Sequence, residues 1–255
     1  LFRLFSNVNT RIDIILLEWM RSDAEVGHYA AATRLIYPLT FLASSLSVTF
    51  LPLLTRHRKS DPAQFSQLSQ LGLKILLGVG LMTTSIVFFR APELIQILYD
   101  ASYEPSGAAL SLLGLATFFI FANFYLFDCL IVQNRQQIAT WTMVGIAAFN
   151  IAANLIFIPV HGILAASMVT VVSNIAAFAI LVSATFAKEK KIMAVFLLKG
   201  SIISAVLFLL ARELANAHIL VFGAVLLLTT LALLPAAGIL TKQDRTFMIS
   251  FFKNR

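Results

Sequence analysis

The chain has 255 residues, of which 59% are hydrophobic and only 12% are charged, and its formal net charge at pH 7 is +7. A soluble domain has about a quarter charged residues, so this composition excludes that class and predicts an integral membrane protein. The sequence has a single cysteine, Cys129, which excludes a disulfide among these residues.

Apolar runs of membrane-spanning length recur along the chain, with short polar connections between them. The runs are continuous rather than alternating, which predicts helices and not the strands of a barrel. We therefore expect an all-α polytopic membrane protein with about eight transmembrane helices. They are predicted over residues 2–20, 26–54, 67–89, 107–132, 138–158, 163–186, 193–213 and 218–240.

Lysine and arginine are unevenly divided between the two sets of connections. The side shared by both chain ends has most of them, among them Arg135 and Lys191, whereas the other side has only Arg21, Arg90 and Arg212. Positive residues favour the cytoplasmic side, so both ends of the chain are predicted to be cytoplasmic. The net positive charge is then a topology signal, with anionic membrane lipids rather than nucleic acid as its partner.

Four ionisable residues lie within the predicted spans: Arg11, Asp13, Arg34 and, nearer to the end of its span, Asp128. A charge at mid-membrane costs about 2.5–3.5 kcal/mol on insertion scales, so such residues are functional candidates. If the first hairpin turns at residues 23–24, Asp13 and Arg34 lie equally deep, about 15 Å below the same membrane face. We expect these two to pair, which leaves Arg11 available for an anionic substrate.

Simpler explanations exist for each candidate. The pair could do no more than join two helices, Arg11 could extend to the cytoplasmic interface, and Asp128 is better explained as an interfacial carboxylate. Asn150 and Asn154 are four residues apart and share a helix face, which is typical of hydrogen bonds between helices and less often of a ligand site.

Motifs of the common enzyme classes are absent from the sequence. It has no phosphate-binding loop, no zinc-protease motif and no nucleophile elbow, and its four histidines show no ligand spacing. We therefore expect no catalytic residue, no metal site and no cofactor. A helical bundle with a few charges inside the membrane is the pattern of a transporter rather than an enzyme.

Four stretches together resemble a known family. They are "RIDIILLEWMRSDAEVGHYAAATRL" (11–35), "FLPLLTRH" (50–57), "APELIQILYDASYEPSGAAL" (91–110) and "NIAANLIFIPVHGILAAS" (150–167). In this order they resemble Wzx-type oligosaccharide flippases, the polysaccharide transporters of the multidrug/oligosaccharidyl-lipid/polysaccharide exporter superfamily. Asp100 and Ala165 stand where the family pattern has glycine.

The resemblance implies a division of the chain. Residues 1–187 would be the second six-helix lobe of a fourteen-helix flippase, and a first lobe of the same polypeptide would precede them. Residues 188–240 would form two peripheral helices, and residues 241–255, which mix basic and apolar side chains, a cytoplasmic amphipathic tail.

The resemblance also implies a function in the bacterial inner membrane. A flippase of this type moves a lipid-linked oligosaccharide, here on undecaprenyl pyrophosphate, across the membrane for a surface polysaccharide such as O-antigen. Candidate cavity residues are Arg11, Asp13, Arg34, Asn150 and Asn154, and H⁺ or Na⁺ would couple through Asp13 or Asp128. A cation-coupled multidrug exporter, a peptidoglycan lipid II flippase, and a membrane glycan polymerase or acyltransferase remain alternatives.

Overall fold

The computed structural model describes residues 12–187, 205–214 and 218–236, and within them every regular element is helical. Short helices cover residues 12–20 and 205–213. The named elements are α2 (Asp23–Ser60), α3 (Pro62–Leu98), the 3₁₀ turn η1 (Ala101–Tyr103), α4 (Pro105–Val132), α5 (Gln136–Thr185) and α7 (Ile219–Ala236). By length and composition α2, α3, α4 and α5 can each cross a membrane. The expected all-α polytopic fold is confirmed.

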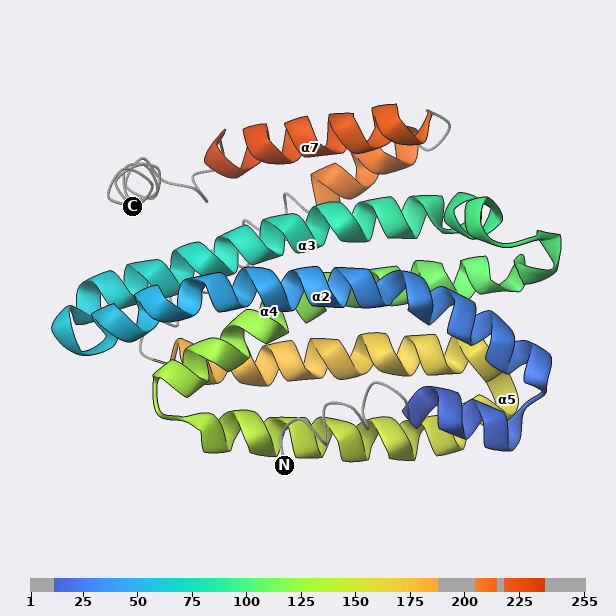
Figure 1. Cartoon of the computed structure of the whole chain (residues 1–255), viewed down its shortest axis with the longest axis horizontal. Coiled ribbons are helices and arrows are strands. Elements are labelled where there is room, and N and C mark those ends of the chain that lie inside the picture. The colour runs from blue at the N-terminus through green and yellow to red at the C-terminus, as the bar shows by residue number, and fades with distance from the viewer. Residues whose placement is uncertain (1–11, 188–204, 215–217, 237–255) are drawn as a thin grey trace.

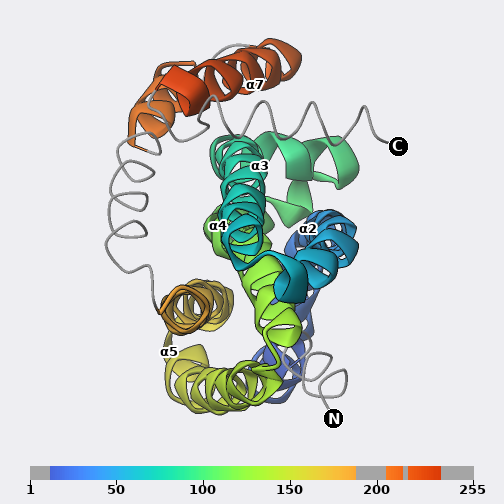
Figure 2. The same ribbon diagram turned by 90° about the vertical axis from the view of Figure 1, so that its left-hand side faces the viewer.

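The bundle is arranged around α4, which packs against α2, α3 and α5 (Figures 1 and 2). α5 is a helical hairpin, because its backbone breaks at Gly162 and the second half runs back beside the first (Figure 1). The two spans predicted over 138–158 and 163–186 are therefore both present. Of the predicted first and seventh spans only residues 12–20 and 205–213 are described, and the tail 241–255 lies outside the described residues.

Short polar side chains set the turns between helices. The hydroxyl of Ser22 accepts a hydrogen bond from the amide of Glu25 and so caps the start of α2. Asp61 serves two helices at once: its amide donates to the carbonyl of His57 at the end of α2, and its carboxylate accepts from the amide of Gln64 at the start of α3. One residue thus closes one helix and opens the next.

The third span is predicted to end at residue 89, but the structure has one continuous helix, α3, which runs on to Leu98. Pro92 lacks the amide that would bond the carbonyl of Phe88 four residues earlier. The hydroxyl of Ser111 on α4 donates to that carbonyl instead, at 3.2 Å. The neighbouring helix thereby satisfies the group that proline leaves open, and α3 continues through it.

α3 and α4 approach closely where a glycine leaves room for an aromatic ring. The hydroxyl of Tyr125 donates to the carbonyl of Leu68 at 3.0 Å, and its ring lies against Gly72. A Cβ at Gly72 would lie 2.2 Å from that hydroxyl oxygen, so no larger residue fits without displacing the ring. Small residues at helix contacts are the usual means of close packing in membranes.

A buried arginine attaches the last described helices to α3. Arg90 is 2% exposed; its guanidinium pairs with Glu93, donates to the carbonyl of Leu214 at 3.2 Å, and lies 4.6 Å from the centre of the Phe222 ring on α7. A cation over an aromatic face is attractive, more so when water is excluded. Arg90 therefore joins three segments at one end of the bundle.

Candidate functional site

Asp13 is the centre of a buried polar cluster. It lies on the helix over residues 12–20, beside the buried Leu16 and Leu17, and is 6% exposed. Its carboxylate accepts hydrogen bonds from the hydroxyl of Tyr29 on α2 at 3.0 Å and from the amide nitrogen of Asn154 on α5 at 2.7 Å. The hydroxyl of Thr170, on the other arm of α5, donates to it at 3.0 Å. Three helical segments besides its own thus converge on one carboxylate.

The two asparagines predicted as candidates belong to this cluster. The side-chain amide of Asn154 also donates to the side-chain oxygen (Oδ1) of Asn150 at 2.9 Å, and the side-chain amide of Asn150 donates to the hydroxyl of Ser173 at 3.2 Å. Asn154 is fully buried, and its own carbonyl oxygen has no hydrogen-bond partner among the described contacts. Buried polar atoms are nearly always bonded, so an open oxygen beside a carboxylate is a place where a ligand could bind.

The predicted pair of Asp13 with Arg34 is wrong. Arg34 is exposed on α2, and no described contact joins it to Asp13. Ser22 caps α2 at residue 23, so the turn lies nearer the N-terminus than expected and the residue level with Asp13 is close to Tyr29. Five residues on, the helix has turned by about 140°, which points Arg34 to a different side.

Arg34 lies instead on the open side of α2. Exposed side chains follow it at helical spacing, among them Tyr37 and Phe41, which are 39% and 74% exposed. α2 is the least buried of the four long apolar helices. Pro38 lacks the amide that would bond the carbonyl of Arg34, so the helix is loosened at this point.

The other two candidates are in different situations. Arg11 lies outside the described residues, so its part in a substrate site stays a prediction. Asp128 is half-buried on α4, and its carboxylate accepts a hydrogen bond from Ser47 on α2. It is not joined to the Asp13 cluster by any described hydrogen bond.

Within the part of the chain that the structure describes, the side chains bonded to Asp13 are neutral donors, and none of them is positively charged. An ionised carboxylate inside a membrane needs a balancing positive charge, and a proton or a small hard cation can supply it. The oxygens within reach are the carboxylate of Asp13, the carbonyl of Asn154 and the hydroxyl of Thr170, which are the kinds of ligand that hard cations prefer. Among the described residues no group of three His, Cys, Asp or Glu side chains could hold a metal ion.

Sequence reasoning missed Tyr29, Thr170 and Ser173. A usable signal existed for two of them, because Thr170 lies as many residues after Gly162 as Asn154 lies before it. Residues at equal distances from a hairpin turn lie at equal depth. The same argument brings Ser173 close to the level of Asn150 on the opposite arm.

In sequence comparisons the chain matches no protein-family model and no curated protein. A solved structure, "Lipid II flippase MurJ, inward closed conformation", matches it with a TM-score of 0.74 at 15% identity. The fold resembles half of a flippase. The match covers 95% of this chain and 52% of that one, so the chain spans about half the length of the structure it matches.

This likeness is one of fold, and the matched protein is described as a flippase, a transporter rather than an enzyme. Together with the four long apolar helices it indicates a multi-pass membrane protein. At 15% identity it shows a shared fold and assigns neither a family nor a substrate. The substrate has to be argued from the site.

Proposed function

We propose that this chain is part of a flippase that moves a lipid-linked oligosaccharide across the bacterial inner membrane by alternating access, driven by a cation bound at Asp13. The observation that carries the proposal is the buried Asp13 carboxylate, which accepts hydrogen bonds from α2 and from both arms of α5, all of them from neutral side chains among residues 12–187. Such intramembrane ionisable residues are characteristic of ion and substrate pathways.

Arg34 is the residue that we assign to the anionic headgroup. Its position on the open side of the least buried span leaves it accessible to a ligand or to the expected first lobe of the same polypeptide. A guanidinium can bind phosphate oxygens with two parallel hydrogen bonds, and this would offset the cost of dehydrating a pyrophosphate group. Arg11 would add to this positive charge if it faces the same side.

The cation is either H⁺ or Na⁺, and the cluster suits both. A proton would neutralise Asp13 directly, and the surrounding hydroxyl and amide groups would then bond to a carboxylic acid. Sodium would use the Asp13 carboxylate, the open carbonyl oxygen of Asn154 and the hydroxyl of Thr170. In either case binding would change the contacts between α2 and the two arms of α5, and those contacts are where alternating access requires two arrangements.

A peptidoglycan lipid II flippase is the second candidate, because the solved structure that shares this fold is one. The two functions differ in the intermediate that builds up when the protein is removed. Accumulation of the lipid-linked repeat unit of a surface polysaccharide, with peptidoglycan synthesis intact, supports the first. Accumulation of lipid II instead would establish the second. Loss of drug resistance with both glycans intact would contradict both and favour an exporter of small cations.

The substrate role of Arg34 is tested by replacing it with alanine. Arg34→Ala should lower export of the glycan about tenfold or more, since a charge-assisted hydrogen bond contributes about 1.5–3 kcal/mol. Arg34→Lys should retain part of the activity, because it keeps the charge but not the forked geometry. The measurement is surface polysaccharide per membrane-inserted protein.

A matched control lies on the same helix. Arg56 is also exposed on α2, but it is 22 residues further along, about 33 Å away and near the other end of the helix. Arg56→Ala should leave export nearly unchanged. Normal export by Arg34→Ala, at normal protein levels, would refute the assignment.

A further inference from the structure

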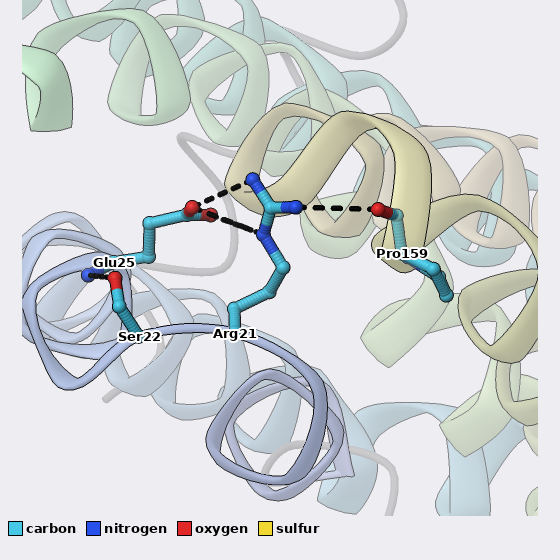
Figure 3. Close-up of polar contacts among 4 residues, drawn as sticks. All are labelled: Arg21, Ser22, Glu25 and Pro159. Atoms are coloured by element: carbon cyan, nitrogen blue, oxygen red, sulfur yellow. Dashed lines mark hydrogen bonds and ion pairs between the residues drawn. The ribbon is translucent and has the colours of Figure 1, made fainter.

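A second polar set joins the same helices nearer to their turns. Arg21, in the connection between the helix over 12–20 and α2, donates from its Nε to both oxygens of Glu25 at 3.0 Å, and its Nη2 lies 2.7 Å from Oε1 (Figure 3). Its Nη1 donates to the carbonyl of Pro159 on α5 at 3.2 Å. We name Arg21, Glu25 and this carbonyl the Arg21 clasp.

The break in α5 makes the carbonyl available. Pro159 lies three residues before Gly162, where φ is 55° and ψ is −132°, and the last carbonyls before a helix break lack an amide partner in their own helix. A guanidinium is well suited to such an acceptor, because it has donors to spare after pairing with a carboxylate. Arg21 therefore caps the first arm of α5 from outside.

Gly162 also leaves the space that the Arg21–Glu25 ion pair occupies. A Cβ on this residue would lie 2.2 Å from Oε2 of Glu25 and 3.2 Å from Nε and Nη2 of Arg21. Its positive φ is a conformation that residues with a side chain rarely adopt. The bare backbone is thus required twice, once for the turn of α5 and once for the clasp that rests on it.

The clasp lies between the Asp13 cluster and one end of the bundle. Arg21 is eight residues beyond Asp13, about 12 Å along the helix, and Pro159 is five residues beyond Asn154, about 7.5 Å. Glu25 is one turn before Tyr29, about 6 Å. On each of the segments involved, the clasp is one to two turns farther out than the cluster, and it links the first hairpin to α5 at that level.

We propose that the Arg21 clasp is a gate that controls access of the cation to Asp13 from the face which the Lys and Arg distribution predicts to be outer. In this structure the gate is closed. Arg21 and Glu25 have side chains that are 30% and 27% exposed, and ion pairs in such positions are weak enough to open without unfolding the bundle. This inference rests on the proposed cation role of the Asp13 cluster, and it makes Arg21 and Glu25 positioning residues rather than ligands.

The test measures how fast a small cation-like probe reaches the cluster. The full-length protein, with Cys129→Ala to remove the native thiol and Thr170→Cys as reporter, is placed in membrane vesicles of known orientation. A positively charged, membrane-impermeant methanethiosulfonate is then applied from one face at a time. Arg21→Gln and Glu25→Gln should each raise the modification rate from the outer face about tenfold, as expected when a closed state loses one holding contact. The rate from the inner face should not change.

Two further variants guard against misfolding as the cause. Arg212→Gln removes another exposed arginine predicted to be on the same face, and it should leave the rate unchanged. Glu25→Asp keeps the charge and should restore part of the protection. Equal outer-face rates in the parent protein, Arg21→Gln and Glu25→Gln would overturn the gate, and so would equal acceleration from both faces.

Export is measured in the Arg21, Glu25 and Arg34 variants of the protein that keeps Thr170, and it separates this proposal from the proposed function. If export depends on Arg34 but the outer-face modification rate is the same with and without Arg21→Gln, the gate is overturned and the proposed flippase function stands. A faster outer-face rate in Arg21→Gln, in a protein whose export does not depend on Arg34, supports the gate and removes the proposed substrate role.

Discussion

Asp13 and Asp128 are both carboxylates within the helical bundle, but their surroundings differ. Asp13 is 6% exposed and accepts hydrogen bonds from Tyr29, Asn154 and Thr170. Asp128 is half-buried, and its side-chain partner in the described part of the chain is Ser47. The first accepts hydrogen bonds from several helical segments, whereas the second accepts one from α2.

This difference is the reason that we propose an ion site at Asp13 and only a helix contact at Asp128. In this proposal a bound cation replaces some of the hydrogen bonds that Asp13 accepts. Cation binding is then linked to the spacing of the three helical segments that supply those bonds. A single hydroxyl partner offers no such exchange. If this comparison is correct, ion dependence belongs to Asp13 alone, although the sequence had offered both residues for that role.

Replacing Asp13 should have the largest effect. Asp13→Asn keeps the size of the side chain but removes the charge that would bind a proton or Na⁺, and it turns a donor toward three groups that already donate. We expect transport to fall roughly 10- to 100-fold, in line with the loss of one or more charge-assisted hydrogen bonds. Transport in vesicles with an imposed pH or Na⁺ gradient measures it. Full dependence on the gradient in this variant would mean that the ion binds elsewhere.

Asn154→Ala should have an intermediate effect. It removes the 2.7 Å hydrogen bond to Asp13 and leaves Asn150 without a donor, at a fully buried position. We expect a loss of about 1–3 kcal/mol in stability and a several-fold weaker response to the cation. Thermal unfolding with and without Na⁺, at fixed pH, measures both.

A buried asparagine elsewhere provides the control for that experiment. Asn123 on α4 is 7% exposed and donates to Asn174 on α5, without contacting Asp13. Asn123→Ala should destabilise the protein by a similar amount and leave the cation response intact. If the stabilisation by Na⁺ is weakened in both variants, cation binding depends on helix packing in general. The result would then contradict a specific role of the Asp13 cluster.

The sequence predicted most of the fold because the apolar runs and their turn residues are strong local signals. The hairpin of α5 is an example: Pro159 and Gly162 mark its turn in the printed sequence, and the structure breaks there. The predicted end of the third span at residue 89 was wrong for a nonlocal reason. Whether Pro92 ends a helix depends on Ser111, which is on another helix and satisfies the open carbonyl.

The site was predictable in part. The sequence did not reveal how each helix is rotated about its axis, and therefore which of its side chains face Asp13. Asp13, Asn150 and Asn154 were candidates as polar residues deep in apolar spans, and the structure brings them together. Depth in the membrane alone could not identify the residue of α2 that contacts Asp13. The turn lies two residues earlier than predicted and the helix is rotated, so Tyr29 rather than Arg34 faces Asp13. Tyrosine in an apolar span is also an ordinary packing residue, so nothing marked it as a donor.

The smallest effect is expected at Asp128, and it tests the comparison from the other side. Asp128→Asn keeps an oxygen that can accept the hydrogen bond from Ser47, so the contact between α2 and α4 survives without a charge. We expect less than about 1 kcal/mol of change in stability, the range of a single neutral hydrogen bond, and a change in transport below about twofold. Ser47→Ala should behave alike if the contact is only structural. A loss of gradient dependence in Asp128→Asn that Ser47→Ala does not share would make Asp128 the coupling group, because only the first variant removes a titratable carboxylate.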